Sequence, residues 1–365
     1  MKSEITKKGI ERATHRALYY AMGYSPEDLK KPIVGLVNSR NECMPGHMQL
    51  DLIARAVREG IIEAGGMPVE FPTIGICDGI AQGNFGMHYP LASRELIADT
   101  IEVMMNAHSY DAMVLVTNCD KITPGMLMAA IRLDVPAILV SGGPMATGYH
   151  KGKAMGYSDL MFSQGLVAKK EMSEAQLAEM ERDALPGCGA CNLLGTANSM
   201  NYLTEALGMC LPGSATPAAS GRRIALARDT GRKIMELLKK GITPRQIVTH
   251  EALENAVVLD LAQVPGRPAP VLPHAQVDAH AVGQVGAAGP GEAGDEEAVD
   301  LEGVGEQGGV RLRVRGRRQD RRGRRAGCAR RSADTIRRIS IVPEGSPLFW
   351  HSLQRPVCFM GMPSP

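Results

Sequence analysis

Residues 118–125 read Asn-Cys-Asp-Lys-Ile-Thr-Pro-Gly and place a thiol, a carboxylate and an amine side by side. A soft thiolate next to a hard oxygen ligand indicates two different metals held close together. An apolar run at 112–116 precedes them and predicts a buried strand, and a helix follows with Thr123 as its expected N-cap. In open α/β sheets, this turn after the carboxyl end of a strand is where ligands bind.

A second oxygen ligand is expected at Asp78, which follows the expected strand 73–77 and precedes Gly79. A carboxylate there suits magnesium, which takes a few protein oxygens and keeps water or substrate in its other positions. Asp-Gly is also a common turn pair, so this position by itself leaves both interpretations open.

Two further segments carry sulfur. Residues 187–192 contain Cys188 and Cys191 in a Cys-x-x-Cys spacing, which fits a redox pair or half of a zinc site. No second pair completes a zinc site. A thiolate close to the start of the helix expected at 196–207 is favoured by the helix dipole, and with Cys119 from another strand end it makes a good iron–sulfur ligand.

The remaining candidates are weaker. Cys43 and His47 lie four residues apart and are either ligands or packing residues. Cys77 and Cys210 lie in apolar segments and are expected to be structural, while Cys328 and Cys358 lie in an irregular C-terminal stretch.

The elements that must position these residues alternate between strand and helix. We expect strands at 33–37, 73–77, 112–116 and 136–140, and helices at 53–64, at 93–105 with Ser93 as cap, at 196–207 and at 222–240. This order predicts an α/β fold with a mostly parallel sheet covered by helices on both faces.

Composition narrows the class of protein. The chain has 365 residues, 44% of them apolar, and a net charge of +2, which implies no particular partner. Its apolar runs are too short to cross a membrane, and its N-terminus lacks the apolar core of a secretory signal. We therefore expect a cytoplasmic protein whose eight cysteines are free, catalytic or metal-bound.

The pattern changes near residue 263. Gly, Ala, Pro and acidic residues dominate 263–309, and eleven arginines fall within 311–331. No periodicity predicts a core there, so we expect 263–365 to be a disordered tail and not a folded domain. Translation in a shifted frame explains this composition better than a nucleic-acid-binding arm, because no aromatic residue interleaves the arginines.

Four segments together resemble the dihydroxy-acid and phosphogluconate dehydratase family: 77–81, 93–99, 119–125 and 187–191. The resemblance runs from about residue 5 to 262. It implies that Cys119 and Cys191 are ligands of an iron–sulfur cluster, either [2Fe–2S] or [4Fe–4S]. It also implies that Asp78, Asp120 and Lys121 bind Mg²⁺, the lysine after carbamylation. One branch of the family has a cysteine directly after the proline at position 45, where this chain has Gly46.

The implied activity is that of a hydro-lyase. A dihydroxy-acid dehydratase converts 2,3-dihydroxy-3-methylbutanoate and its methylpentanoate homologue to 2-oxo acids in valine, leucine and isoleucine biosynthesis. The alternatives are a sugar-acid dehydratase acting on 6-phosphogluconate and a non-catalytic protein with a nucleic-acid-binding tail. The resemblance also implies a homodimer for the intact family; we expect no membrane or nucleic-acid partner.

One departure from the family lies after residue 262. Relatives continue into a Gly-Gly-Ser-Thr-Asn stretch and a β-rich domain that supplies another glutamate ligand and a serine base, and none of this is recognisable here. We therefore expect an incomplete N-terminal dehydratase domain at 1–262, truncated or frame-shifted, with little or no activity and no identified catalytic base.

Overall fold

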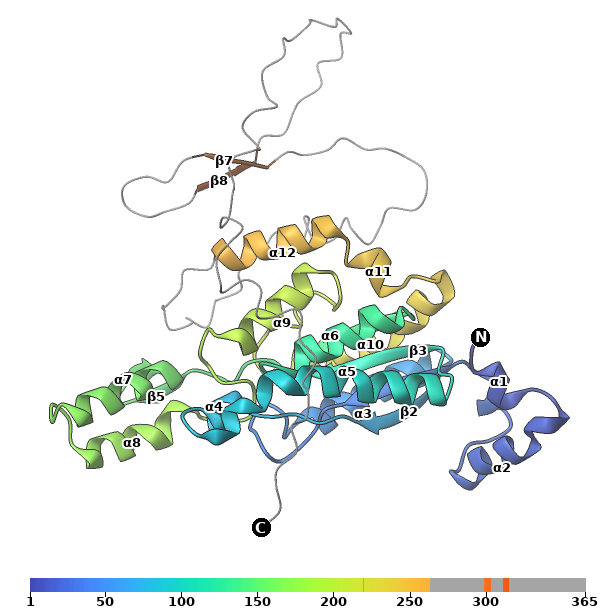
Figure 1. Ribbon diagram of the computed structural model, residues 1–365, viewed down its shortest axis with the longest axis horizontal. Helices are drawn as coiled ribbons and strands as arrows, with labels where there is room; N and C mark the ends of the chain where they lie inside the picture. The colour runs from blue at the N-terminus through green and yellow to red at the C-terminus, as the bar shows by residue number, and fades with distance from the viewer. Residues whose placement is uncertain (219, 263–298, 303–310, 315–365) are drawn as a thin grey trace, which may run out of the picture. The chain divides into compact units, whose positions relative to one another are not determined.

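A parallel sheet forms the centre of the computed structural model, which describes residues 1–218, 220–262, 299–302 and 311–314 (Figure 1). Its strands are β1 (Ile33–Asn38), β2 (Met67–Pro72), β3 (Ala112–Thr117) and β4 (Ala137–Ser141). They pair in the order β2-β1-β3-β4, and every pair is parallel. The predicted α/β class with a parallel sheet is therefore confirmed.

Helices make up most of the rest of the first unit. They are α1 (Glu4–Lys7), α2 (Ala13–Ala21), α3 (Leu50–Glu63), α4 (Asp78–Ala81), α5 (Pro90–Ala107), α6 (Ile122–Leu133), α7 (Tyr157–Ala168), α8 (Glu174–Ala184), α9 (Thr196–Ala206), α10 (Gly221–Lys240), α11 (Pro244–Ile247) and α12 (His250–Ala262), with short 3₁₀ helices at Ile10–Arg12, Asp28–Lys30 and Phe85–His88. A hairpin of β5 (Gly148–His150) and β6 (Lys153–Met155) lies with α7 and α8 in an arm at the left of Figure 1. Within the described residues, no helix is long and apolar enough to cross a membrane.

Both faces of the sheet are covered, as alternation along the strands requires. On one face, Ile33 and Val37 of β1 belong to a core that includes the buried side chains of α5 and α6. On the other face, Val34 and Leu36 join a second core built with α3 and α10. Because β1, β3 and β4 are buried along their whole length, their sequences read as continuous apolar runs, which is why these three strands were predictable.

The strand predicted at 73–77 is wrong. The structure places β2 earlier, at Met67–Pro72, and the ladder ends where the Thr73 amide donates to the Asn38 carbonyl at 3.1 Å. Prolines at positions 68 and 72 argue against a strand in sequence, but β2 lies at the edge of the sheet, where proline is tolerated. Residues 73–77 instead form an extended connection to α4.

Two predicted helix starts also differ. Helix α6 begins at Ile122 with Lys121 as its N-cap, so Thr123 lies in the first turn, with its hydroxyl 3.0 Å from that of Thr117. Helix α5 begins at Pro90, and the Ser93 hydroxyl donates to the Pro90 carbonyl instead of capping the helix. Proline at the first helical position is a favourable start, and it moves the helix three residues upstream.

The tail predicted at 263–365 lies outside the described residues except for two short strands. These are β7 (Val299–Glu302) and β8 (Arg311–Val314), which pair antiparallel in a second compact unit. We expected no strand there. The alternation of arginine with leucine and valine across 311–314 has the period of a strand and explains β8.

Replacing Gly231 with alanine is expected to destabilise the chain by about 2 kcal/mol, in the range for overpacking a close contact. Helices α3 and α10 cross closely: a Cβ on Gly231 would meet the Val57 carbonyl oxygen, and one on Gly60 would meet that of Arg228. Backbone atoms cannot rotate away, so the helices must separate. Urea unfolding followed by circular dichroism measures the loss.

The matched control is Gly165→Ala, because Gly165 also lies inside a helix but has no atom within 4 Å of its would-be Cβ. Alanine there should stabilise the chain by up to about 1 kcal/mol through helix propensity. If both substitutions shift the unfolding midpoint in the same direction, then Gly231 is not required for the close crossing of α3 and α10.

Candidate active site

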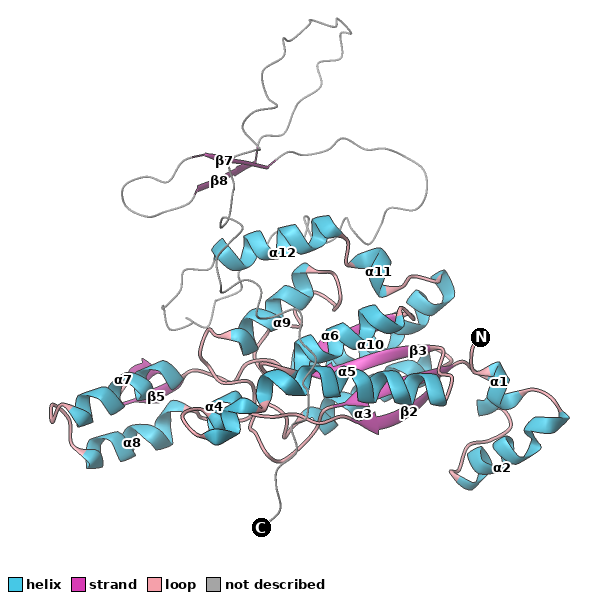
Figure 2. Cartoon of the chain, viewed as in Figure 1, coloured by secondary structure: helices cyan, strands magenta, loops and turns pink. Residues whose placement is uncertain are grey.

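The loops that follow β1, β3 and β4 meet at the carboxyl edge of the sheet, where they appear in pink in Figure 2. Asn118, the first residue after β3, joins them. Its side-chain amide donates to the carbonyls of Gly46 at 3.0 Å and Gly143 at 2.9 Å, each more than twenty residues away in sequence. One buried amide thereby fixes the relative positions of three loops.

The segment that carries Cys191 is held against the same loops by backbone hydrogen bonds. The amide of Gly189 donates to Pro45 at 3.0 Å, and that of Ala190 donates to Gly143 at 2.9 Å. In return, the Met145 amide donates to Ala190 at 2.8 Å. This pairing brings Cys191 to the edge of the sheet that Cys119 occupies.

Cys119 has an unusual backbone and little space beside its sulfur. Its φ is +65°, a left-handed conformation rare for residues other than glycine, and its side chain is only 9% exposed. A Cβ on Gly46 would meet the Cys119 sulfur and lie 3.5 Å from the Ala190 amide nitrogen. Glycine at position 46 therefore leaves room between Cys119 and the Cys191 segment. Backbone strain of this kind is retained at functional sites at a cost of about 1–3 kcal/mol.

Two carboxylates share one ammonium group next to these sulfurs. Lys121 Nζ lies 2.8 Å from Asp78 Oδ2 and 3.2 Å from Asp120 Oδ2, and all three side chains are more than three-quarters buried. The other oxygens, Asp78 Oδ1 and Asp120 Oδ1, are buried without a hydrogen-bond partner. Buried oxygens of this kind are costly unless a ligand satisfies them.

The electrostatics of this trio leave one uncompensated negative charge. Burial and the neighbouring Asp120 raise the pKa of Asp78, against the opposing effect of Lys121. Burial opposes the charge on Lys121, but its hydrogen bonds to the two carboxylates raise its pKa overall, so it stays protonated. The formal charges of two carboxylates and one ammonium sum to −1, and a cation bound to the free oxygens would offset that charge.

The thiols lie in a low-dielectric environment. Burial raises the pKa of Cys119 well above its usual value, and the charges of Cys191 and Cys77 raise it further. Burial also raises the pKa of Cys191, with Cys77 again contributing. Both shifts favour the thiol over the thiolate, and a bound metal would favour the thiolate by displacing the proton.

Of the two alternatives left open for Cys43 and His47, ligands or packing residues, the structure favours packing for His47. The His47 ring is fully buried, and its two nitrogens face the carbonyls of Ser39 at 2.7 Å and Asn118 at 3.1 Å. Neither nitrogen is free to bind a metal, and Cys43 is exposed. His47 instead connects the loop after β1 to the loop after β3 at Asn118, which is the packing role that the sequence left open.

Sequence reasoning missed Cys77 and Tyr157. The thiol of Cys77 packs with Cys119 and Cys191 against the same apolar core. Asn192 positions Tyr157, because the side-chain oxygen of Asn192 accepts a hydrogen bond from the backbone amide of Tyr157 at 2.9 Å. The hydroxyl of Tyr157 donates to the side-chain oxygen of Gln82 at 2.8 Å. The proximity of Cys77 to Asp78 was visible in sequence, but nothing local connected position 157 to this site.

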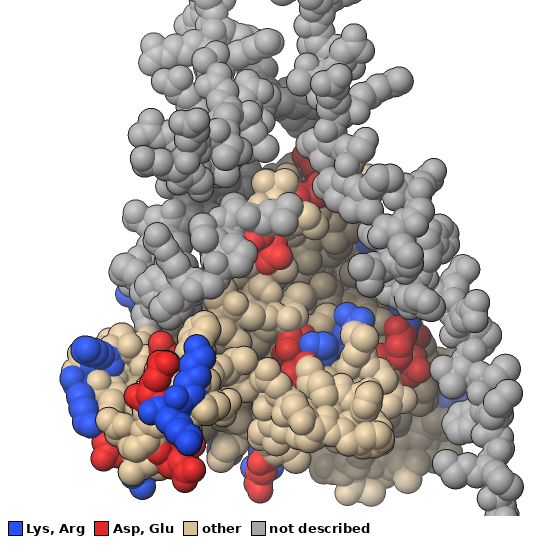
Figure 3. Space-filling model, turned by 60° about the vertical axis from the view of Figure 1, so that its left-hand side comes forward, with Lys and Arg blue, Asp and Glu red and all other residues tan. Residues whose placement is uncertain are grey.

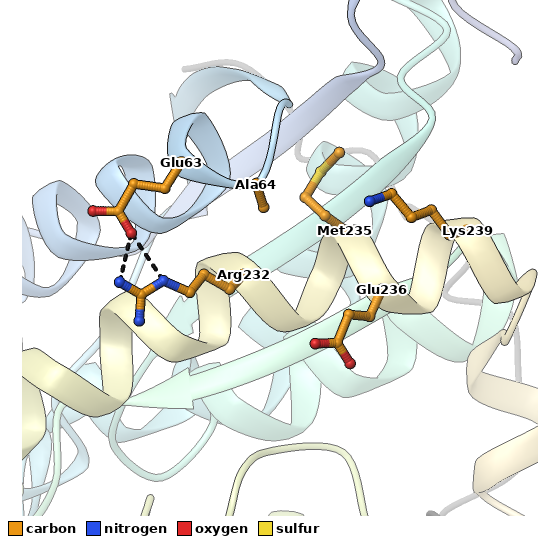
Figure 4. A pocket seen from close by; sticks show the side chains of 6 residues that line it. All are labelled: Glu63, Ala64, Arg232, Met235, Glu236 and Lys239. Atoms are coloured by element: carbon orange, nitrogen blue, oxygen red, sulfur yellow. Dashed lines mark hydrogen bonds and ion pairs between the residues drawn. The ribbon is translucent and has the colours of Figure 1, made fainter.

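Within the described residues, no group of three or more His, Cys, Asp or Glu side chains is arranged to hold a single metal ion. A pocket of about 250 Å³ does occur, but it lies between α3 and α10 (Figure 4). It is lined by Glu63 and Arg232, which are paired at 2.6 Å, and by Ala64, Met235, Glu236 and Lys239. Glu63 ends the helix that begins near the sheet's carboxyl edge, so this pocket is separate from the site.

Comparison with known proteins identifies the family. Residues 31–265 match the model of the family described as dihydroxy-acid/6-phosphogluconate dehydratase N-terminal. The chain belongs to this family. The matched range contains all the cysteines, carboxylates and loops of the site described above.

Curated relatives of this dehydratase family cover the same region. Proteins named dihydroxy-acid dehydratase are 55% identical in Caldanaerobacter subterraneus subsp. tengcongensis, 56% in Acetivibrio thermocellus and 57% in Clostridium novyi. Each match covers 72% of this chain but only 47–48% of the relative. The chain therefore spans about half the length of the curated relatives it matches.

Proposed function

We propose that this chain is the N-terminal part of a hydro-lyase that dehydrates short 2,3-dihydroxy acids to 2-oxo acids, using an iron–sulfur cluster and Mg²⁺. One observation carries the proposal: two thiols and a pair of carboxylates with free oxygens meet at the carboxyl edge of one parallel sheet. The names of the relatives support the same activity.

The residues present fit both groups. We assign Asp78 and Asp120 as Mg²⁺ ligands because each has a buried oxygen without a partner and because oxygen is the ligand that Mg²⁺ prefers. Lys121 contacts both carboxylates and is assigned to the same ion after carbamylation, which would replace its positive charge with a further oxygen ligand. Cys119 and Cys191 are assigned to the cluster, and Gly46 leaves space beside the first of them.

Dehydration of a 2,3-dihydroxy acid requires loss of the C2 proton and of the C3 hydroxyl. When bound, the two groups supply Lewis acidity toward the departing hydroxyl and toward the negative charge that develops beside the carboxylate. The chain's own residues orient these groups: Asn118 and His47 hold the loops, and burial of Cys119 excludes water. The base that takes the C2 proton is not assigned to any described residue.

Turnover of two substrates by a full-length relative tests the choice within the family. We expect 2,3-dihydroxy-3-methylbutanoate to be dehydrated with a higher kcat/KM than 6-phosphogluconate, because the similar relatives are named dihydroxy-acid dehydratase. The appearance of 2-oxo acid measures both reactions. Preference for 6-phosphogluconate would favour the sugar-acid dehydratase, which the family description also names.

A nucleic-acid function receives no support from the face that Figure 3 shows. Figure 3 shows basic and acidic side chains interspersed on this face, without a broad basic stripe. Electrostatic binding to phosphates requires such a stripe. The arginines at 311–331 that motivated this alternative lie outside the described residues except in β8. The proposed loss of activity in this chain also depends on residues beyond 262 and is tested by assaying the chain itself.

A further inference from the structure

We propose that Cys77 is a third sulfur ligand of the iron–sulfur cluster, together with Cys119 and Cys191. The inference rests on the proposed function, since it concerns the same cluster, and it replaces the structural role that the sequence predicted for Cys77. Clusters of both kinds take four terminal ligands, so three thiolates would leave one iron short of a protein sulfur and open to a substrate hydroxyl.

The backbone around Cys77 runs along the segment that carries Cys119. Asp78, the next residue, contacts Lys121 at 2.8 Å, two positions after Cys119. On the other side, a Cβ on Gly75 would lie 3.1 Å from Ile122 Cγ1 and 3.1 Å from Met44 Cε. Residues 75–78 therefore lie beside residues 119–122, so Cys77 and Cys119 belong to neighbouring segments of the chain.

Tyr157 connects Cys77 to Cys191. Its amide donates to Asn192, the residue after Cys191, at 2.9 Å. Its hydroxyl lies 3.5 Å from the carbonyl of Gly79, two residues after Cys77. The backbone and the side chain of this one residue thus contact both cysteine segments.

The three thiols form a mutual set. Cys119 belongs to the apolar core against which Cys77 and Cys191 both pack, so all three thiols lie on the same side of the sheet. Cys77 is half-buried, and in the described part of the chain it forms no disulfide. Among the described residues, no such set of side chains is arranged to hold one metal ion. A cluster joins sulfurs that lie farther apart, and each thiol loses its proton to solvent as it binds iron.

Anaerobic reconstitution of the full chain with ferrous iron and sulfide tests the assignment. We compare the wild type with Cys77→Ser and with Cys188→Ser, a matched control because Cys188 is exposed. Iron and acid-labile sulfide per chain, the electron paramagnetic resonance spectrum after reduction and the rate of iron loss to a chelator are measured. We expect Cys77→Ser to lose iron at least about tenfold faster, as changes to metal-site residues do, and to give an altered spectrum.

A second measurement needs no substitution. Alkylation of the wild type should modify Cys77 in the apo chain and spare it in the loaded chain, while Cys188 reacts in both. Unchanged iron retention and spectrum in Cys77→Ser, or full alkylation of Cys77 in the loaded chain, would overturn the inference and leave the proposed function intact. A wild type that takes up no iron and sulfide would instead overturn both.

Discussion

Cys119→Ser is expected to abolish the visible absorbance of the reconstituted chain and its content of acid-labile sulfide. A serine hydroxyl is a hard ligand with a very high pKa and does not replace a thiolate on iron. The corresponding change in a full-length relative should lower kcat/KM by about a thousandfold, because a Lewis acid supplies several kcal/mol of stabilisation to the transition state.

The control is Cys43→Ser. Cys43 is exposed in the loop after β1, and its replacement should leave absorbance, sulfide content and activity unchanged. Because Cys119 is buried at a left-handed backbone position, the folding of its variant is checked by far-ultraviolet circular dichroism before reconstitution. A folded Cys119→Ser chain that keeps the full spectrum would remove Cys119 from the cluster.

Asp120→Asn is expected to remove the stabilisation that Mg²⁺ confers on this chain. At a free Mg²⁺ concentration one hundred times the dissociation constant, binding stabilises the folded state by about 2.7 kcal/mol. The variant replaces one of the two carboxylates that have a free oxygen with a neutral amide, which is a weaker ligand for Mg²⁺, and so loses most of that effect. Thermal unfolding with Mg²⁺ and with a chelator measures the difference as a change in Tm.

Unfolding measured in the presence of a chelator separates the effect of metal binding from the intrinsic stability of the variant. Without Mg²⁺, Asp120→Asn loses an ion pair with Lys121 but also relieves repulsion with Asp78, so it should unfold within about 1 kcal/mol of the wild type. The control Asp51→Asn removes an exposed ion pair with Arg55 and should keep the full response to Mg²⁺. An equal Mg²⁺ response in Asp120→Asn would exclude this aspartate as a ligand.

Much of the site was predictable because parallel strands end at one edge. Asp120 and Lys121 follow β3 directly, and any residue in that turn must lie at the carboxyl edge of the sheet. Asp78 was predicted by the same reasoning, although its strand was misplaced: β2 ends at Pro72, and an extended connection carries the chain five residues farther. The family motifs in 77–81 and 187–191 were recognisable because each is a continuous stretch of residues.

The sequence alone determined the class of fold, the positions of β1, β3 and β4, and the identity of the thiols and carboxylates that end up together. Periodic burial and the turn after each strand depend on residues close together in the sequence, so both can be recognised from the sequence alone. Only the tertiary structure decided which side chains share the site: Asn118 joins loops 72 and 25 residues away, and Tyr157 reaches from α7 to Gly79. Those contacts depend on how loops of irregular conformation pack, and no local pattern encodes such packing. The sequence therefore predicted a structural core role for Cys77. In the folded chain, Cys77 is a neighbour of two other thiols.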